Sequence, residues 1–169
     1  MGIIDYSNRI GNVLARIRTG PNVSEENREI ILEYYRHLQL SDYSAARTYK
    51  ILTHLCKIAE NIDFDLKKAI RGDIENFVIW LKERTDINDT TRVDYKTVMK
   101  TFYKWLNGGE RFPECIEWMK ATHRHINKKL PEAMYSEDDV RRLIEGAGTL
   151  RDKAFISLLW ETGARIGEI

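Results

Sequence analysis

The sequence has 169 residues, of which 43% are hydrophobic and 31% are charged, with ten glycines and three prolines. A chain of this length fits one domain of roughly 100–150 residues with part of a second, and its composition excludes a disordered or low-complexity protein. The formal net charge is only +1, so a surface that attracts nucleic acid must come from basic residues gathered on particular helices.

The first two predicted helices are joined by a short turn. Apolar residues at helical spacing predict a helix from Tyr6 to Thr19, and Gly20 is expected to end it in the left-handed conformation. Ser24 is expected to cap the second helix, which runs to about Leu40.

Four more helices are predicted before residue 128. Their expected caps or first residues are Ser41-Asp42, Gly72-Asp73, Thr90 and Pro113, and their expected spans are 43–59, 73–81, 90–106 and 113–127. The Asn-Gly-Gly sequence at 107–109 is expected to stop the fifth helix, and the sixth should bury Ile116 and Met119.

The remainder of the chain is predicted to be a linker followed by two helices. Residues 128–135 contain a Leu-Pro pair and form the linker. Ser136 and Asp139 should cap a helix together, and a last helix over 150–161 should close at Thr162-Gly163. Because no segment alternates like a strand, the expected fold class is all-α.

Other features argue against a metal centre or a membrane protein. Cys56 and Cys115 do not form a CxxC pair, which argues against a zinc site or disulfide framework and favours a reducing, cytoplasmic location. His123 and His125 would point about 200° apart on a helix. The sequence lacks the roughly 20-residue apolar run of a membrane span and a signal-peptide pattern.

Two predicted helices carry basic residues along one side. On the third helix they are Arg47, Lys50, His54 and Lys57, which lie within roughly 80° of one another at about 100° per residue. On the fifth helix they are Arg92, Lys96, Lys100 and Lys104, which span about 18 Å. A stripe of this kind is also typical of a solvated helix face, so the pattern alone indicates only a phosphate-binding bundle as one alternative.

Further residues are candidates for the same phosphate contacts. Thr90 and Thr91 supply hydroxyl groups at the start of the fifth helix, and Tyr103 lies between Arg92 and Lys96 in helical angle. Lys128 and Lys129 form a basic pair in the linker. We therefore group these side chains with the candidate phosphate-binding residues.

The C-terminal part of the chain resembles the opening of the tyrosine recombinase (phage integrase) catalytic domain. The resemblance is carried by Ser136-Glu137-Asp138-Asp139-Val140, by Arg151-Asp152-Lys153-Ala154, and by the TG-x-R-x-x-E box within residues 158–169. Upstream, residues 41–52 and 90–103 look like the two DNA-facing helices of the family's core-binding domain.

This resemblance implies a domain organisation. Residues 1–21 would be an N-terminal helix or arm, and 22–127 a compact SAM-like helical bundle that is the core-binding domain. Residues 136–169 would be the truncated helical start of the catalytic domain. The family's catalytic lysine, its His-x-x-Arg box and its tyrosine nucleophile have no counterpart here, so we expect no strand-rejoining activity from this chain alone.

The resemblance also implies site residues and a reaction. Arg165 would grip the scissile phosphate, a task for which a planar, always charged guanidinium is suited, and Glu168 would orient it. In the family, DNA integration and recombination proceed through a 3′-phosphotyrosine, without metal or other cofactor. The expected partners are double-stranded DNA and further copies of the full-length protein on that DNA.

Two other functions remain open from the sequence. The chain could be a non-catalytic DNA-binding antagonist of a recombinase, although such a protein would gain nothing obvious from Arg165. It could also be a helical protein-interaction bundle whose lysine stripes keep it soluble.

Overall fold

A computed structural model describes residues 5–122 and 134–168, and within these ranges the chain forms helices and no strands. The chain divides into two compact units, Met1–Ile126 and Asn127–Ile169. The all-α prediction is confirmed for the described residues. Lys128, Lys129 and most of the expected linker lie outside them.

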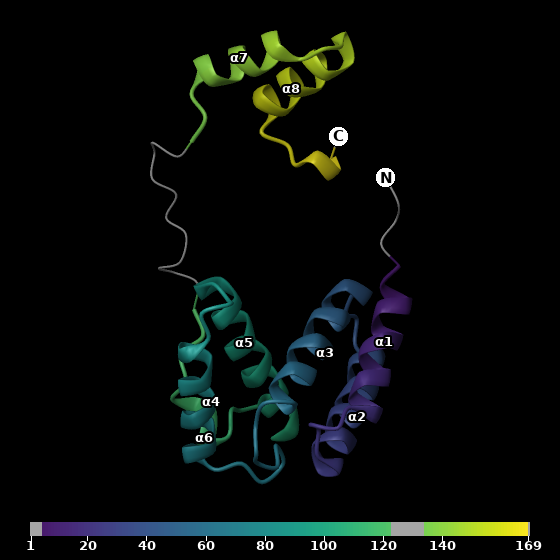
Figure 1. Cartoon of the computed structure of the whole chain (residues 1–169), viewed down its shortest axis with the longest axis vertical. Coiled ribbons are helices and arrows are strands. Elements are labelled where there is room, and N and C mark those ends of the chain that lie inside the picture. The colour runs from purple at the N-terminus through teal and green to yellow at the C-terminus, as the bar shows by residue number, and fades with distance from the viewer. Residues whose placement is uncertain (1–4, 123–133, 169) are drawn as a thin grey trace. The chain divides into compact units, whose positions relative to one another are not determined.

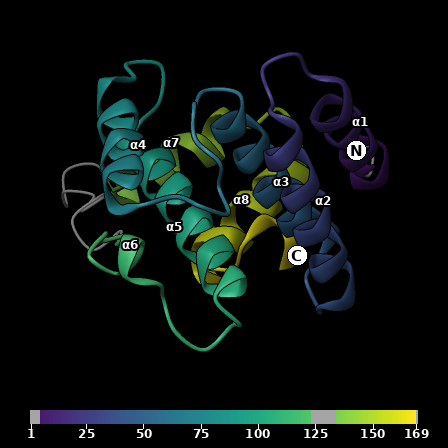
Figure 2. The same ribbon diagram turned by 90° about the horizontal axis from the view of Figure 1, so that it is seen from below.

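The first unit has two central helices, α3 and α5, flanked by the others (Figures 1 and 2). In the view of Figure 1, α1 and α2 lie on one side of this pair and α4 and α6 on the other. The helices are α1 (Tyr6–Thr19), α2 (Glu25–Leu40), α3 (Ala45–Ala59), α4 (Arg71–Glu83), α5 (Asp89–Leu106) and α6 (Glu114–Glu117).

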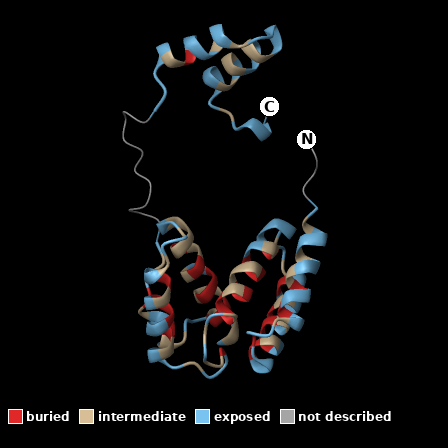
Figure 3. Cartoon of the chain, in the orientation of Figure 1, coloured by how far each residue is buried: buried red, intermediate tan, exposed pale blue. Residues whose placement is uncertain are grey.

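All six helices contribute to one hydrophobic core, which appears as the inward-facing red segments in Figure 3. Tyr34 of α2 and Phe102 of α5 meet edge to face at its centre, with ring centroids 5.2 Å apart. Leu14 and Ile17 of α1 belong to the same core, so helix α1 is part of the bundle and not a separate arm. No helix among the described residues combines the length and apolar character of a membrane span.

The observed helix starts match the expected caps at Ser24 and Ser136, whereas the starts of α3 and α4 differ from those expected. Ser24 caps α2, and Ser136 and Asp139 cap the first helix of the second unit reciprocally, as expected. The cap of α3 is Ser44 and not Ser41-Asp42, since the Ser44 hydroxyl accepts from the Arg47 N–H.

Helix α4, in contrast to α3, begins earlier than expected. Ile70 occupies the N-cap position, and Asp73 accepts from its N–H at 2.9 Å, so Asp73 does help to cap the helix, but from within the first turn. At the far end of α5, Gly108 and Gly109 adopt φ values of 81° and 87°, so the expected stop is confirmed. The predicted helix over 113–127 is wrong in length, because α6 is a single turn, although Ile116 and Met119 are buried as expected.

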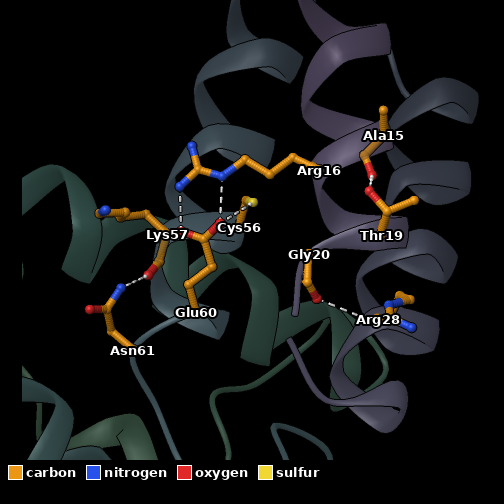
Figure 4. Close-up of polar contacts among 9 residues, drawn as sticks. All are labelled: Ala15, Arg16, Thr19, Gly20, Arg28, Cys56, Lys57, Glu60 and Asn61. Atoms are coloured by element: carbon orange, nitrogen blue, oxygen red, sulfur yellow. Dashed lines mark hydrogen bonds and ion pairs between the residues drawn. The ribbon is translucent and has the colours of Figure 1, made fainter. Parts of the chain in front are cut away.

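Gly20 ends α1 for a different reason from the one expected. Its φ is −64°, outside the left-handed region, and its N–H donates to the Arg16 carbonyl at 2.8 Å. A Cβ at this position would lie 2.5 Å from that carbonyl oxygen. The turn therefore needs glycine because a side chain would collide with the Arg16 carbonyl oxygen, and not because the backbone adopts a left-handed φ. Figure 4 shows the Gly20 carbonyl accepting from Arg28 of α2.

Replacing Gly20 with alanine is expected to lower the free energy of unfolding by about 1–2 kcal/mol, because a backbone atom cannot move aside as a side chain can. Urea denaturation followed by circular dichroism measures this. Gly11 is the matched control: it lies inside α1, and a Cβ added there would meet nothing within 4 Å, so Gly11→Ala should raise stability by about 0.5–1 kcal/mol. Equal effects of the two substitutions would contradict the close-approach explanation.

The second unit is a helix pair, α7 (Glu137–Gly146) and α8 (Leu150–Thr162), followed by the short 3-10 helix η2 (Ile166–Glu168). Helix α8 closes at Gly163, whose φ of 61° is left-handed, as the Thr-Gly sequence predicts. Val140 is buried against α8, whereas no residue of α8 is itself buried. Large apolar side chains, including Leu150, Trp160 and Ile166, are exposed on this unit.

Candidate nucleic-acid interface

A groove of about 450 Å³ lies between α3 and α5. We call it the α3–α5 groove, and it is lined by Ser44, Ala46, Arg47, Lys50, Ile51, Asp94, Thr97, Val98 and Thr101. The two helices run in opposite directions. Tyr43, just before α3, lies beside Trp105 near the end of α5, and His54 further along α3 contacts Tyr95 near the start of α5.

The first half of α3 supplies the groove with its cations. Arg47 is exposed, and its guanidinium lies over the Tyr43 ring at 4.6 Å from the centroid. The Lys50 ammonium is 2.8 Å from a carboxylate oxygen of Asp94, so part of its charge is already balanced. Among the described residues, Arg47 has no carboxylate within ion-pair distance and keeps its full charge for a ligand.

The other two expected basic residues of α3 do not join them. The His54 ring packs at 4.4 Å from Tyr95 and its Nδ1 is 2.7 Å from the Lys50 carbonyl. Burial lowers the pKa of His54 below its ordinary value, so the ring is neutral at pH 7 and adds no positive charge. Lys57 lies in the last turn of α3, outside the groove lining.

The expected single ridge on α5 is wrong, because two of its four cations hold the bundle together. Arg92 donates to the carbonyl groups of Leu81 and Arg84 at the end of α4, and its side chain is 26% exposed. The Lys100 ammonium donates to the Met119 carbonyl at 2.9 Å and lies over the Phe112 ring. Both side chains therefore satisfy backbone carbonyls on the side of α4 and α6, away from the groove.

The remaining two cations of α5 differ from each other. Burial, with a smaller contribution from Lys82, lowers the pKa of Lys96, which faces α4. Lys104 continues the stripe that Thr97 and Thr101 begin, at i, i+4 and i+7, and has no acidic partner within ion-pair distance in the described part of the chain. The candidate interface is therefore the α3–α5 groove together with Lys104.

The hydroxyl groups of the interface come from residues that the sequence analysis did not select. Thr97 and Thr101 donate to the carbonyl groups four residues earlier, and a hydroxyl hydrogen can rotate from there to a phosphate oxygen. Their i, i+4 and i+7 spacing with Lys104, which places all three side chains on one side of a helix, could have identified them from the sequence. Thr90 and Thr91, which were expected to contact DNA, lie in the first turn of α5 and do not line the groove; Asn88 caps that helix through the Thr91 N–H.

Tyr103 is not a DNA-facing residue. Its side chain is 2% exposed and packs edge to face on Phe102. Among the described residues, its hydroxyl is a buried group without a hydrogen-bond partner, and burial raises its pKa above the ordinary value. Leaving a buried hydroxyl unpaired costs free energy.

Replacing Tyr103 with phenylalanine should therefore raise the free energy of unfolding, by up to about 1 kcal/mol, while leaving any DNA binding unchanged. Urea denaturation gives the first quantity and fluorescence anisotropy with labelled duplex the second. Tyr95 provides the control, since its hydroxyl accepts from Arg84 at 3.4 Å and Tyr95→Phe should not stabilise the protein. A loss of stability in Tyr103→Phe would contradict the prediction.

The second unit presents Arg165 directly after the end of α8. The Arg165 side chain is 90% exposed, and its Nη1 lies 3.5 Å from a carboxylate oxygen of Glu168. The other Glu168 oxygen accepts from the Arg165 N–H at 2.8 Å. Glu168 thus holds the backbone as well as the side chain of Arg165, and it leaves most of the guanidinium open to an anion.

No group of three metal-binding side chains occurs within residues 5–122 and 134–168. His123 and His125 fall outside the described residues. The groups of the candidate interface that bind oxyanions are the guanidinium of Arg47, the ammonium groups of Lys50 and Lys104, and the hydroxyl groups of Thr97 and Thr101. Comparison of the chain with protein families, with characterised proteins and with solved structures finds no match.

Proposed function

We propose that this chain is the DNA-binding part of a site-specific tyrosine recombinase. The first unit would be its SAM-like core-binding domain and the second the start of its catalytic domain, in a cytoplasmic protein. The observation that carries the proposal is the TG-x-R-x-x-E box in its local structure: a left-handed Gly163 ends α8 and is followed by an exposed Arg165 held by Glu168.

The α3–α5 groove supports the DNA-binding part of the proposal. Arg47 and Lys104 carry charge that no carboxylate among the described residues balances, and Thr97 and Thr101 line the groove with Arg47. Phosphate oxygens accept from such groups regardless of base sequence, so the groove would position DNA and not read it. In the full-length enzyme, Arg165 would hold the scissile phosphate during transesterification.

A protein-interaction bundle is the second candidate, and one observation favours it. Arg92 and Lys100 serve the fold, which leaves fewer cations for DNA than the sequence suggested. The two functions differ in their dependence on salt, because binding to phosphates releases counterions and binding to a protein partner through apolar contacts does not.

Fluorescence anisotropy of a labelled duplex, titrated with the whole chain at increasing NaCl, tests the proposal. With three cations in the interface, the logarithm of the association constant should fall with log salt at a slope of about −2 to −3, for duplexes of unrelated sequence alike. Absence of duplex binding at low salt would refute the proposal and leave the interaction bundle.

A further inference from the structure

A second pocket, of about 440 Å³, adjoins the α3–α5 groove at Thr101, which lines both. We call it the aromatic pocket, and its lining consists of Tyr34, His37, Tyr43, Thr101, Lys104, Trp105, Gly108 and Gly109. Its volume falls within the roughly 300–1,000 Å³ typical of sites for small organic groups. The phosphate-binding role of the groove does not use it.

Aromatic faces form one wall of this pocket. The exposed His37 ring is nearly parallel to Tyr34 and to Trp105, at interplanar angles of 19° and 29° and centroid distances of 5.8 Å in both cases. Tyr34 is buried behind them. A flat ring that enters the pocket would therefore meet preformed stacking surfaces.

Charge and backbone shape complete the pocket. Lys104 is one of the lining residues, with its ammonium group 6.0 Å from the centroid of the Phe112 ring, and Arg47 of the groove lies over the ring of Tyr43, which also lines the pocket. Gly108 and Gly109 have no other atoms within 4 Å of a Cβ position, so they leave space beside the backbone. The pocket thus combines stacking surfaces with cations on the side of the groove.

We propose that the aromatic pocket binds an unpaired nucleobase of the DNA that lies in the groove. This inference rests on the proposed function. A nucleobase is a neutral flat ring linked to a phosphate, which matches aromatic faces beside Lys104. A bare phosphate would not use the aromatic faces, and an apolar peptide side chain would not use the ammonium group.

The test compares a short duplex that contains one unpaired thymidine with the same duplex fully paired. The chain should bind the first about tenfold more tightly, the size of effect that stacking of one base on aromatic side chains produces. His37→Ala should bring this preference close to one while paired-duplex affinity stays within about twofold, because His37 does not line the groove. Arg47→Ala, the matched control, should weaken both complexes equally.

Photocross-linking gives a second measurement. With 5-iodo-2′-deoxyuridine as the unpaired nucleotide, the adduct should form at His37, Tyr43 or Trp105, and an adduct confined to other residues would overturn the assignment. Equal affinity for the two duplexes would refute the pocket and leave salt-dependent duplex binding in place. Failure to bind either duplex would refute the proposed function and the pocket together.

Discussion

Replacing Arg47 and Lys104 together with alanine is expected to weaken binding to duplex DNA by about tenfold to hundredfold, regardless of sequence. These are the two interface cations without an acidic partner at ion-pair distance among the described residues, so each can neutralise a phosphate. Each lost phosphate contact makes the negative slope of log affinity against log salt shallower by about 0.9, so the two substitutions together should reduce its steepness by about two units. Anisotropy titrations at several salt concentrations measure both quantities.

A control with the same change in net charge separates local contacts from general attraction. Lys68 and Arg71 are exposed, lie before and at the start of α4, and pair with Asp65 and Glu75. Replacing both with alanine should change the affinity by less than about threefold, since exposed pairs of this kind contribute little. If this control weakened DNA binding as much as the Arg47 and Lys104 substitutions, the groove would not be the interface.

Replacing Arg28 with alanine is expected to lower the free energy of unfolding by about 3 kcal/mol, more than any other substitution considered above. The Arg28 guanidinium donates to the carbonyl groups of Ile17, Gly20 and Val23 at 3.0, 3.2 and 3.0 Å. It thereby ties α2 to the end of α1 and to the turn between them. Each lost bond leaves a partly buried carbonyl short of a donor, at a cost of about 1 kcal/mol.

Urea denaturation followed by circular dichroism measures this loss. Arg28→Lys should recover only part of it, because an ammonium group lacks the planar fork that reaches three carbonyls. Arg36→Ala is the matched control on the same helix, where the side chain is exposed, and it should stay within about 0.5 kcal/mol. A small effect of Arg28→Ala would show that the turn is held by its apolar contacts instead.

The internal roles of Arg92 and Lys100 change how lysine and arginine stripes should be interpreted. At the sequence level these residues are indistinguishable from Arg47 and Lys104, since all are cations on amphipathic helices. In the fold, Arg92 meets the carbonyl end of α4, where a cation also interacts favourably with the helix dipole, and Lys100 meets the Met119 carbonyl just after α6. An arginine or lysine that lies near the carbonyl end of a neighbouring helix therefore donates to those carbonyl groups, and it is then not free to bind a ligand.

Local patterns were sufficient for much of the structure. The 3.6-residue spacing of apolar side chains predicted the helices, and short-range hydrogen bonding predicted the caps at Ser24 and Ser136 and the ends at Gly108 and Gly163. These features depend on residues within one turn of each other, so the sequence carries them directly. The same holds for the contact between Arg165 and Glu168, which are three residues apart.

The tertiary structure decided which side chains share a surface. Nothing local distinguishes Tyr103, whose buried hydroxyl has no partner in the described part of the chain, from an aromatic residue that faces a ligand. Likewise, the groove depends on α3 and α5 packing in opposite directions. The sequence determined the helices and their ends, whereas burial and partner choice followed from packing between helices distant in the chain, which no periodicity within one helix encodes.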